Sequence, residues 1–427
     1  MSTAVHHSME GWPKYRLRFL LKKTRSEDEL SKLKIAQEVS FVPMEAIGEQ
    51  GELDVTQTKP KEEVSNGYTL FFDGDVLVAK ITPCFENGKG AVARGLAGGI
   101  GFGTTELYVL DPSDKLDEQY LYYLTVSEPF RKFGEASMKG AAGQKRVPDE
   151  FIQDYRLDIP PLETQRRIAD YLDRETARID ALVAEKEKML ALLEEKRTAL
   201  ISSKVTRGLD PNAPLKPSGL DWLGDIPAHW ETSKFSWVVY IAEGQVDPEN
   251  ARYLNYALIA PNHIESGTGK LLLRETAEEQ GAISGKYPCR PGDVIYSKIR
   301  PALRKACLAE EECLCSADMY PLRPYGMLDP EFLLYLLLSD QFSTWAVLES
   351  QRVAMPKINR ETLNELRIPV PPISEQRDIS VFLRSNLRLI DRQREAILDS
   401  VSLLRERRAT LITAAVTGQL DPEEMAA

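Results

Sequence analysis

The sequence repeats itself once, and this repeat limits the folds that the chain can adopt. Residues 159–211 align without a gap to residues 370–422 at an offset of 211 positions, with 19 identities in 53 positions. Both copies begin with a Pro-Pro pair and close with Leu-Asp-Pro. A gapless match of this length indicates a duplication, so the chain contains two copies of one structural element.

Both copies have residues that are typical of the start and the end of a long helix. The Pro-Pro pairs precede Glu163 and Ser374, where a helix can start, and the Leu-Asp-Pro triplets stop it. Between these limits, positions spaced alternately by four and three residues form a largely apolar seam for one partner helix. The positions are Ile168, Leu172, Glu175, Ile179, Leu182, Lys186, Met189, Leu193, Lys196 and Leu200, and then Ile379, Leu383, Asn386, Ile390, Gln393, Ile397, Ser400, Leu404, Arg407 and Leu411.

The segments outside these helices repeat more weakly but in the same order. Gly74-Asp75-Val76 matches Gly292-Asp293-Val294, and Lys80-Ile81 matches Lys298-Ile299, at an offset of 218. Each large segment combines a β-branched run, at 76–81 or 294–299, with one helix, near 118–133 or 330–348, so an α+β fold is predicted. The expected plan is a domain at 1–158, a helix at 159–211, a domain at 212–369, and a helix with a C-terminal tail at 370–427.

The order of these regions also constrains their geometry. The second domain lies between the end of the first helix and the start of the second, so those two ends must be close together. An antiparallel coiled coil meets this condition and pairs both apolar seams. We therefore expect two α/β domains separated by two long antiparallel helices, with an internal pseudo-two-fold repeat of the kind that reads two half-sites on DNA.

Composition is that of a globular chain, with 43% hydrophobic and 28% charged residues among 427. No apolar run approaches the length of a membrane span, so we expect a cytoplasmic protein with no membrane partner. The net charge of -11 opposes nucleic-acid binding, but it is spread as -5, 0, -5 and -1 over the four regions, and basic residues cluster inside the two domains. Such clusters are either DNA contacts or solvated loops.

Catalytic motifs are missing from the sequence. The glycines of 98–103 lack dinucleotide-binding spacing, and Gly269-Lys270 lacks the Ser or Thr of a P-loop. The Asp75 to Lys80 segment and its repeat resemble a nuclease layout only loosely, so a turn and strand is predicted. For Cys307, Cys313 and Cys315 we predict buried thiols, because their spacing is not that of a zinc site.

Several motifs together resemble one known family. These are the opening Trp222-Leu223-Gly224-Asp225-Ile226-Pro227 with Trp230, the two Gly-Asp-Val strands, and the Pro-Pro-x-x-x-Gln-Arg starts of both helices. They resemble the specificity (HsdS) subunit of type I restriction-modification enzymes over nearly the whole chain. The first domain departs from the pattern, because Gly11-Trp12-Pro13 keeps the tryptophan without the longer motif, which leaves the start of that domain open.

This resemblance implies a non-catalytic subunit that reads a bipartite site on double-stranded DNA, one half-site per recognition domain, with the helices setting the spacer. It implies two methyltransferase subunits that carry S-adenosylmethionine and methylate adenine N6 in each half-site after flipping the base. It also implies restriction subunits that use ATP and Mg²⁺. No cofactor or metal is expected in this chain.

The resemblance also raises the basic loops to candidate DNA contacts, since they recur at matching places in both domains. Lys and Arg there would hold phosphates or guanine edges, and Gln144 and Asn359 could read adenine. The candidates are Lys80, Lys89, Lys139, Gln144, Lys145 and Arg146 in the first domain, and Lys298, Arg300, Arg304, Lys305, Arg352, Lys357, Asn359 and Arg360 in the second.

Three alternatives remain open at this point. A related type II recognition subunit would share the architecture and differ only in what its partner chain encodes. A coiled-coil adaptor that binds only proteins is favoured by the net charge of -11 and opposed by the duplicated basic loops. A catalytic nuclease is opposed by the missing motifs.

Overall fold

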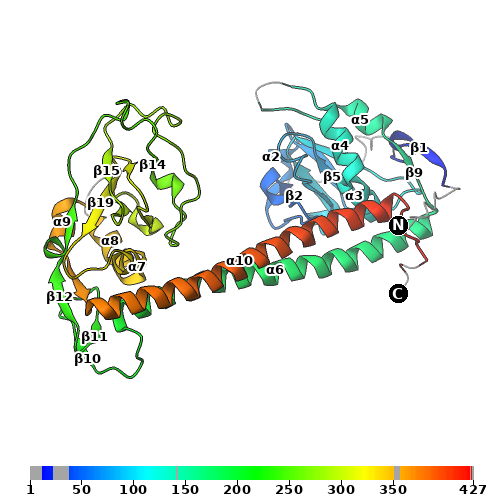
Figure 1. Cartoon of the computed structure of the whole chain (residues 1–427). Coiled ribbons are helices and arrows are strands. Elements are labelled where there is room, and N and C mark those ends of the chain that lie inside the picture. Colours follow the sequence, from blue (N-terminus) through cyan, green and yellow to red (C-terminus); the bar gives the residue numbers. More distant parts are fainter. Residues whose placement is uncertain (1–11, 23–37, 141–142, 351–355, 424, 426–427) are drawn as a thin grey trace, which may run out of the picture. The chain divides into compact units, whose positions relative to one another are not determined.

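The computed structural model describes residues 12–22, 38–140, 143–350, 356–423 and 425. The chain forms two compact units. Unit 1 comprises Met1–Lys186 with Asp399–Ala427, and unit 2 comprises Glu187–Leu398. Helix α6 (Leu162–Arg207) and helix α10 (Ile373–Val416) each contribute a part to both units, whereas every other element belongs to one (Figure 1).

The described residues of unit 1 form two small sheets and a two-stranded ribbon. One sheet has the order β3-β2-β7-β4, the other has the order β6-β5-β8, and β1 pairs with β9. The strands are β1 (Lys14–Arg16), β2 (Glu38–Val42), β3 (Thr58–Pro60), β4 (Thr69–Phe72), β5 (Val76–Ala79), β6 (Gly90–Val92), β7 (Ile100–Gly103), β8 (Leu107–Leu110) and β9 (Arg156–Asp158). The β5 strand is central and buried throughout, as its β-branched and apolar sequence predicts.

Unit 2 has a similar layout. A sheet of order β13-β19-β16-β17 lies beside one of order β14-β18-β15, and β12 pairs with β20 as β1 does with β9. The strands are β10 (Leu215–Pro217), β11 (Asp225–Pro227), β12 (Glu231–Lys234), β13 (Val239–Ile241), β14 (Leu258–Ile259), β15 (Tyr287–Cys289), β16 (Val294–Ser297), β17 (Ala306–Leu308), β18 (Cys313–Cys315), β19 (Met319–Pro324) and β20 (Arg367–Val370). The β16 strand corresponds to β5 in sequence and in its central position.

The single helix expected in each domain is in fact two. The structure has α3 (Glu118–Val126) and α4 (Glu128–Ser137) in unit 1, and α7 (Pro330–Leu338) and α8 (Asp340–Ser350) in unit 2. The break falls at Ser127 and at Ser339, whose backbones are extended and whose hydroxyls each donate 2.7 Å to the carbonyl three residues back. The side-chain bond replaces the next helical bond, so serine ends the first helix.

The other helices among the described residues are short. In unit 1 they are α2 (Lys61–Val64), α5 (Asp149–Asp154) and the 3-10 turns η1 (Leu17–Phe19), η2 (Met44–Ala46) and η3 (Ala97–Gly99). In unit 2 they are α9 (Arg360–Glu365), η4 (Phe235–Trp237), η5 (Pro261–His263) and η6 (Pro301–Leu303). Among the described residues, no helix combines the length and hydropathy that crossing a membrane requires.

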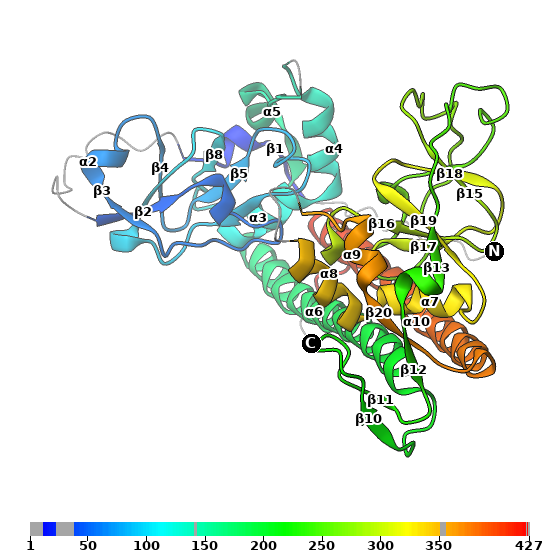
Figure 2. The same ribbon diagram turned by 90° about the vertical axis from the view of Figure 1, so that its left-hand side faces the viewer.

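The two long helices lie side by side, as expected, and the contacts within each unit show that they run in opposite directions (Figures 1 and 2). In unit 1 the first part of α6, at Ile168 and Leu172, packs with the last part of α10, at Ile412 and Val416. In unit 2 the last part of α6, at Val205, shares a core with the first part of α10. Both helices begin one residue earlier than predicted, at Leu162 and Ile373.

The predicted seam is correct at its start and wrong further along. Leu182 and Met189 are 40% and 50% exposed, whereas Val183 is buried and Arg197 occupies the interior position expected for Lys196. In α10, Val401 is buried in place of Ser400. A straight helix drifts by about 20° per heptad relative to a strict 3.5-residue repeat, so the buried face gradually passes from one predicted position to the residue after it.

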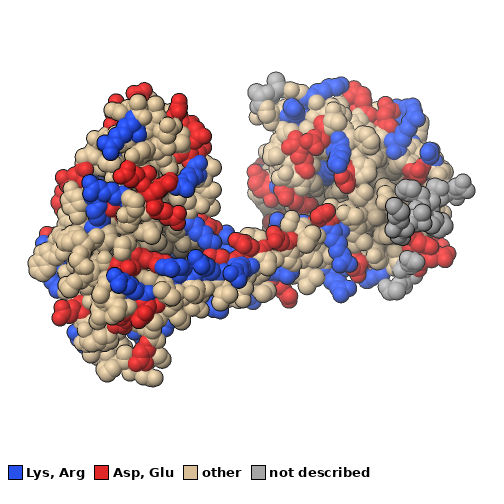
Figure 3. All heavy atoms as spheres, in the orientation of Figure 1, with Lys and Arg blue, Asp and Glu red and all other residues tan. Residues whose placement is uncertain are grey.

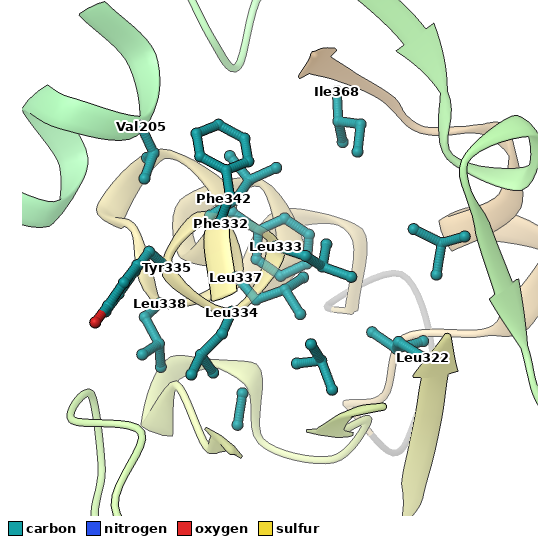
Figure 4. Close-up of a cluster of buried hydrophobic side chains, with 14 of the residues drawn as sticks. Val205, Leu322, Phe332, Leu333, Leu334, Tyr335, Leu337, Leu338, Phe342 and Ile368 are labelled. Carbon is teal, nitrogen blue, oxygen red and sulfur yellow. The ribbon is translucent and has the colours of Figure 1, made fainter. Parts of the chain in front are cut away.

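In each unit, one helix of the domain connects the long helices α6 and α10 to the sheets. This helix is α7 in unit 2 and α3 in unit 1. In unit 2, α7 packs against β16, β17 and β19, and its side chains fill the core with Leu322 and with Val205 of α6 (Figure 4). In unit 1, α3 packs against β5 and β6 in the same way. Burial of these leucines and aromatic residues supplies the main stabilisation of each unit.

Two matched glutamines fix where each long helix begins. The Gln165 side chain accepts a bond from the Asp117 amide at 2.9 Å and donates to the Lys115 and Pro160 carbonyls. Gln376 makes the equivalent bonds with Asp329, Met327 and Pro371. Both glutamines are fully buried with their polar atoms paired, which explains why the Pro-Pro-x-x-x-Gln pattern is the same in both repeats.

Candidate nucleic-acid interface

The first matched pair of candidate residues lies at the ends of the two central strands. Lys80 directly follows β5, and its ammonium lies 5.3 Å from the ring centroid of Tyr108. Lys298 directly follows β16 and lies 5.1 Å from the ring of Tyr320. A lysine over a tyrosine face is held by cation–π attraction, so the charge has the same place in both units.

The tyrosines beneath these lysines are fixed by the segment that follows the helices. The Tyr108 hydroxyl donates to the Val147 carbonyl at 2.6 Å and to Asp149, and the Tyr320 hydroxyl donates to the Ile358 carbonyl at 3.3 Å. Burial raises the pKa of both phenols. The sequence search missed these tyrosines, although they match at the same offset of 212 as the flanking helix residues.

Candidates far apart in sequence meet beside the two lysines. The Val147 amide donates to the Lys80 carbonyl and the Ile358 amide to the Lys298 carbonyl, both at 2.9 Å. Isolated bridges pair Ile81 with Arg146 and Ile299 with Lys357. The structure therefore brings the loop after the central strand and the segment after the paired helices together, in the same way in each unit.

In unit 1 the place where these two segments meet carries an exposed loop. Lys139 and Arg146 exchange backbone hydrogen bonds at 3.0 and 2.9 Å, which places Gln144 and Lys145 near the end of the loop, where both are exposed. The Arg146 guanidinium contacts the Glu106 carboxylate through bonds of 2.6 to 3.1 Å. This pairing raises the pKa of Arg146 and lowers that of Glu106, so both groups stay charged.

In unit 2 the corresponding region includes two residues in a left-handed backbone conformation. Arg300 and Arg304 have φ of 48° and 45° and flank the turn η6. The Arg300 side chain is exposed and its amide contacts the Pro356 carbonyl at 3.4 Å, which places it beside Lys357. The Arg304 side chain instead donates to the Thr198 hydroxyl of α6 at 3.3 Å.

Other candidates have their charged groups committed to protein atoms. Lys89 donates to the Met44 carbonyl at 3.1 Å, and its counterpart Lys305 donates to the Pro261 carbonyl at 2.7 Å. Each of these carbonyls belongs to the first residue of a 3-10 turn, so the two lysines, which directly precede β6 and β17, hold matching turns against the β5–β6 and β16–β17 hairpins.

The last candidates lie around the start of α9. Arg360 donates to the carbonyls of Ile241 and Ala242, both at 2.9 Å, and its guanidinium lies 4.9 Å from the Tyr320 ring centroid. Asn359 is half-buried at the N-cap position of α9, where its side chain makes no capping bond. Arg352 lies outside the described residues.

Charge on the surface is mixed in both units. Figure 3 shows lysine and arginine spheres interspersed with aspartate and glutamate on the visible face of each unit. Acidic partners such as Glu106 explain why the net charge is negative although basic side chains gather at particular loops. An arrangement of this kind positions single charges and lacks the strong uniform field of a non-specific binder.

The cysteines are predominantly buried, as predicted. Cys289, Cys307, Cys313 and Cys315 are no more than 2% exposed in unit 2. Burial raises the pKa of the Cys307 thiol to about 12. Within the described residues, no three or more histidine, cysteine or carboxylate side chains are grouped so that they could hold a metal ion.

Known proteins match this chain in two separate regions, which correspond to its two similar parts. The family model for the type I restriction modification DNA specificity domain matches residues 9–191 and again residues 227–400. The EcoDI specificity subunit of Escherichia coli, a type I restriction enzyme subunit, is 29% identical over 328 residues, which cover 73% of this chain and 72% of that one. The EcoEI specificity subunit of the same organism is 48% identical over 135 residues, which cover 31% of this chain and 23% of that one.

Solved structures share the fold. A chain from a type I R-M system, studied for its complex assembly and conformational transition, has a TM-score of 0.73 at 19% identity and covers 96% of this chain and 99% of its own length. The HsdS subunit from Thermoanaerobacter tengcongensis has a TM-score of 0.56 at 20% identity, covering 96% and 98%. At these identities the likeness concerns the fold alone.

Proposed function

This chain belongs to the family of type I restriction-modification DNA specificity proteins, and from that premise we propose that it reads a two-part DNA sequence with one half-site per recognition domain. It is a specificity subunit with two target-recognition domains, since the family model matches it twice. We propose that these domains are residues 1–158 and 212–369, and that residues 159–211 and 370–427 form the helical regions between and after them.

In each domain a lysine lies over a tyrosine ring at the end of the central strand, and this repeated arrangement is the observation that supports DNA contact there. Lys80 over Tyr108 and Lys298 over Tyr320 put a positive charge at the same point of each domain, beside the segments that carry Arg146 and Lys357. Two half-sites on one duplex present two equivalent sets of phosphates, and a duplicated cation suits them.

We assign the candidate residues to two groups. The first group lies at exposed or half-buried positions, at Lys80 and Lys298 or beside them, and would contact phosphates and base edges. This group comprises Lys80, Lys139, Gln144 and Lys145 with Lys298, Arg300, Lys357 and Asn359. The others, Lys89, Arg146, Arg304, Lys305 and Arg360, would hold the reading loops in place, because each already bonds a protein atom.

Catalysis would reside in partner subunits. We propose that the chain itself is non-catalytic, that two methyltransferase subunits carrying S-adenosylmethionine methylate adenine N6 in each half-site, and that restriction subunits use ATP and Mg²⁺ to cleave DNA. The chain would act on DNA in the cytoplasm. Its own contribution would be to place two reading surfaces along one duplex, which needs no bound cofactor.

Exchange of one domain tests this function. Residues 212–369 are replaced by the matching domain of a relative with a known target, and the methylated motif is sequenced in cells that also carry the methyltransferase. One half of the motif should change while the other half and its methylation are retained. If both halves change, the domains are not independent readers; if no bipartite motif is methylated by the unaltered chain, the proposed function fails.

A further inference from the structure

A tight hairpin projects from unit 2 onto α10. Ile264 and Leu271 form a bridge, and the Glu265 amide donates to the Lys270 carbonyl at 2.9 Å. The loop turns through Gly267 and Gly269, whose φ values of 70° and 80° lie in the left-handed region that glycine adopts without strain. The hairpin therefore has a defined shape, with an acidic residue at one end and a basic residue at the other.

Both ends of this hairpin form ion pairs with α10. The Lys270 ammonium lies 2.7 Å from a carboxylate oxygen of Asp391, and the Glu265 carboxylate lies 3.0 Å from the guanidinium of Arg394. The two pairs have opposite polarity and lie about one helical turn apart on α10. A displacement of the hairpin along the helix would place like charges together, so the pairs define one register.

The helix side of these contacts is itself held in place. Asp391 is 14% exposed and also binds the buried guanidinium of Arg197 from α6. Arg394 also lies 3.6 Å from Glu194 of α6. Each carboxylate or guanidinium that the hairpin meets is thus fixed between the two helices, and the register that it defines refers to the helix pair as a whole.

The hairpin is joined to the proposed reading loop. The Gly267 amide donates to the Arg304 carbonyl at 3.1 Å, and the Arg304 side chain reaches Thr198 of α6. Arg304 closes the η6 turn that begins next to Arg300, a proposed DNA contact. A movement of the hairpin along α10 would therefore also move the reading loop.

Unit 1 holds its domain to the helices differently. At the matching position, Arg408 binds Asp180 at 2.9 Å and also reaches the backbone carbonyl of Gln50 at 3.5 Å. The charged hairpin is a feature of the second domain.

We propose that the hairpin from Glu265 to Lys270 is a positioning clamp that fixes the second recognition domain on the helix pair and so narrows the spacer length that the protein accepts. The inference rests on the proposed function, because a spacer exists only for a protein that reads two half-sites. Lys270 and Glu265 act through the placement of the reading loop and do not touch DNA bases themselves.

The test uses the full chain in complex with its methyltransferase and the motif established by methylation sequencing. Duplexes carry the natural spacer or one that is a single base pair longer or shorter, and a further set carries one mismatch in the second half-site. The variants are Lys270→Met and Glu265→Gln, alone and together, which remove charge with little change of shape. Arg274→Met is the matched control, since it breaks an exposed pair with Glu311 that includes no residue of α6 or α10.

We expect each single variant to lose up to about fivefold of its preference for the natural spacer, and the double variant to lose more, because one partly exposed ion pair shifts an equilibrium by a factor of about five at most. Discrimination against the half-site mismatch should stay unchanged. In Glu265→Arg the preference should fall further, and adding Arg394→Glu should restore part of it, which a merely structural effect would not do. The control should behave as the unaltered protein.

Two results would overturn the clamp. One is an unchanged spacer preference in the folded double variant, and the other is an equal loss of spacer and mismatch discrimination, which would make the hairpin a reading or folding element. Absence of any bipartite binding by the unaltered complex would instead contradict the proposed function. Circular dichroism of each variant establishes that it is folded, and the reversed pair provides a second measurement if a single variant is not.

Discussion

The guanidinium of Arg197 donates a hydrogen bond to the carboxylate of Asp391 inside the helix pair of unit 2. Arg197 is 2% exposed, so the charge is almost completely removed from water. The equivalent residues of the repeat make the same contact in unit 1, where Arg408 donates to Asp180 at 2.9 Å. The arginine of each repeat therefore pairs with the aspartate of the other repeat. Two equivalent helices make such reciprocal contacts when they run in opposite directions.

Replacement of Arg197 and replacement of Arg408 should lower the free energy of unfolding by different amounts. Arg197→Met leaves Asp391 with Lys270 as its remaining charged partner and should lower the free energy of unfolding by about 3 kcal/mol, as expected when a buried pair loses one member. Arg408→Met should cost less, because Asp180 is 27% exposed and water can solvate it. Chemical denaturation of the two variants measures the difference.

Arg178→Met provides the control for this comparison. Arg178 lies on the same helix, is 76% exposed, and is 4.0 Å from Glu175. Its replacement should change the free energy of unfolding by less than about 0.5 kcal/mol. Equal effects at Arg197 and Arg178 would contradict the view that the buried pair defines how the helices associate.

The two groups of lysines should respond differently to substitution. Lys80→Met and Lys298→Met should each weaken DNA binding by the methyltransferase complex and reduce the slope of log affinity against log salt by about 0.9, the value for one lost phosphate contact. Lys89→Met and Lys305→Met should lower thermal stability and leave the salt slope unchanged, since their ammonium groups bond carbonyls. Titrations at several salt concentrations together with thermal denaturation separate the groups; the reverse pattern would refute the assignment.

The isolated chain should bind DNA weakly. Its net charge of -11 and paired basic residues such as Arg146 leave few phosphate contacts, so tight binding requires the cationic surface of a partner. Gel-shift titrations of the chain with and without its methyltransferase, each at two salt concentrations, measure the contribution of the partner. Binding by the chain alone that is as tight as binding by the complex would contradict this expectation.

Lengthening both helices should lengthen the spacer. The helices have 46 and 44 residues, which at 1.5 Å per residue is about 69 and 66 Å. Duplicating Leu182 to Lys188 together with Gln393 to Asp399 adds seven residues to each helix and moves the domains apart by about 10 Å, or about 3 base pairs of B-DNA. Seven residues are close to two full turns, so the buried faces should stay nearly aligned.

Methylation sequencing of the lengthened variant gives the result directly. The added distance also turns the distal half-site by roughly 100° about the DNA axis, so the variant should bind more weakly unless the DNA twists. A folded, active variant that still methylates the parental motif with its original spacer would show that the helices do not set the distance. Circular dichroism establishes that the inserted residues are helical.

The sequence by itself determined the plan of the chain. The gapless repeat at an offset of 211 gave two equivalent helices, and the order of regions required them to be antiparallel, as the contacts within each unit are. The Gly-Asp-Val strands were also correct, because a buried strand is specified by a local run of apolar residues. These features are local or repeated, so the amino-acid sequence alone predicts them.

Only the tertiary structure decided which side chains meet. The seam drifted from Leu182 to Val183 because a slight difference in period accumulates along a long helix, and the position of the drift depends on the partner. The sequence could not distinguish Lys80, which lies on an aromatic ring, from Lys89, which bonds a carbonyl, although both are lysines in basic loops. Whether a charge is available to a ligand depends on neighbours distant in sequence, and chain folding alone brings those neighbours together.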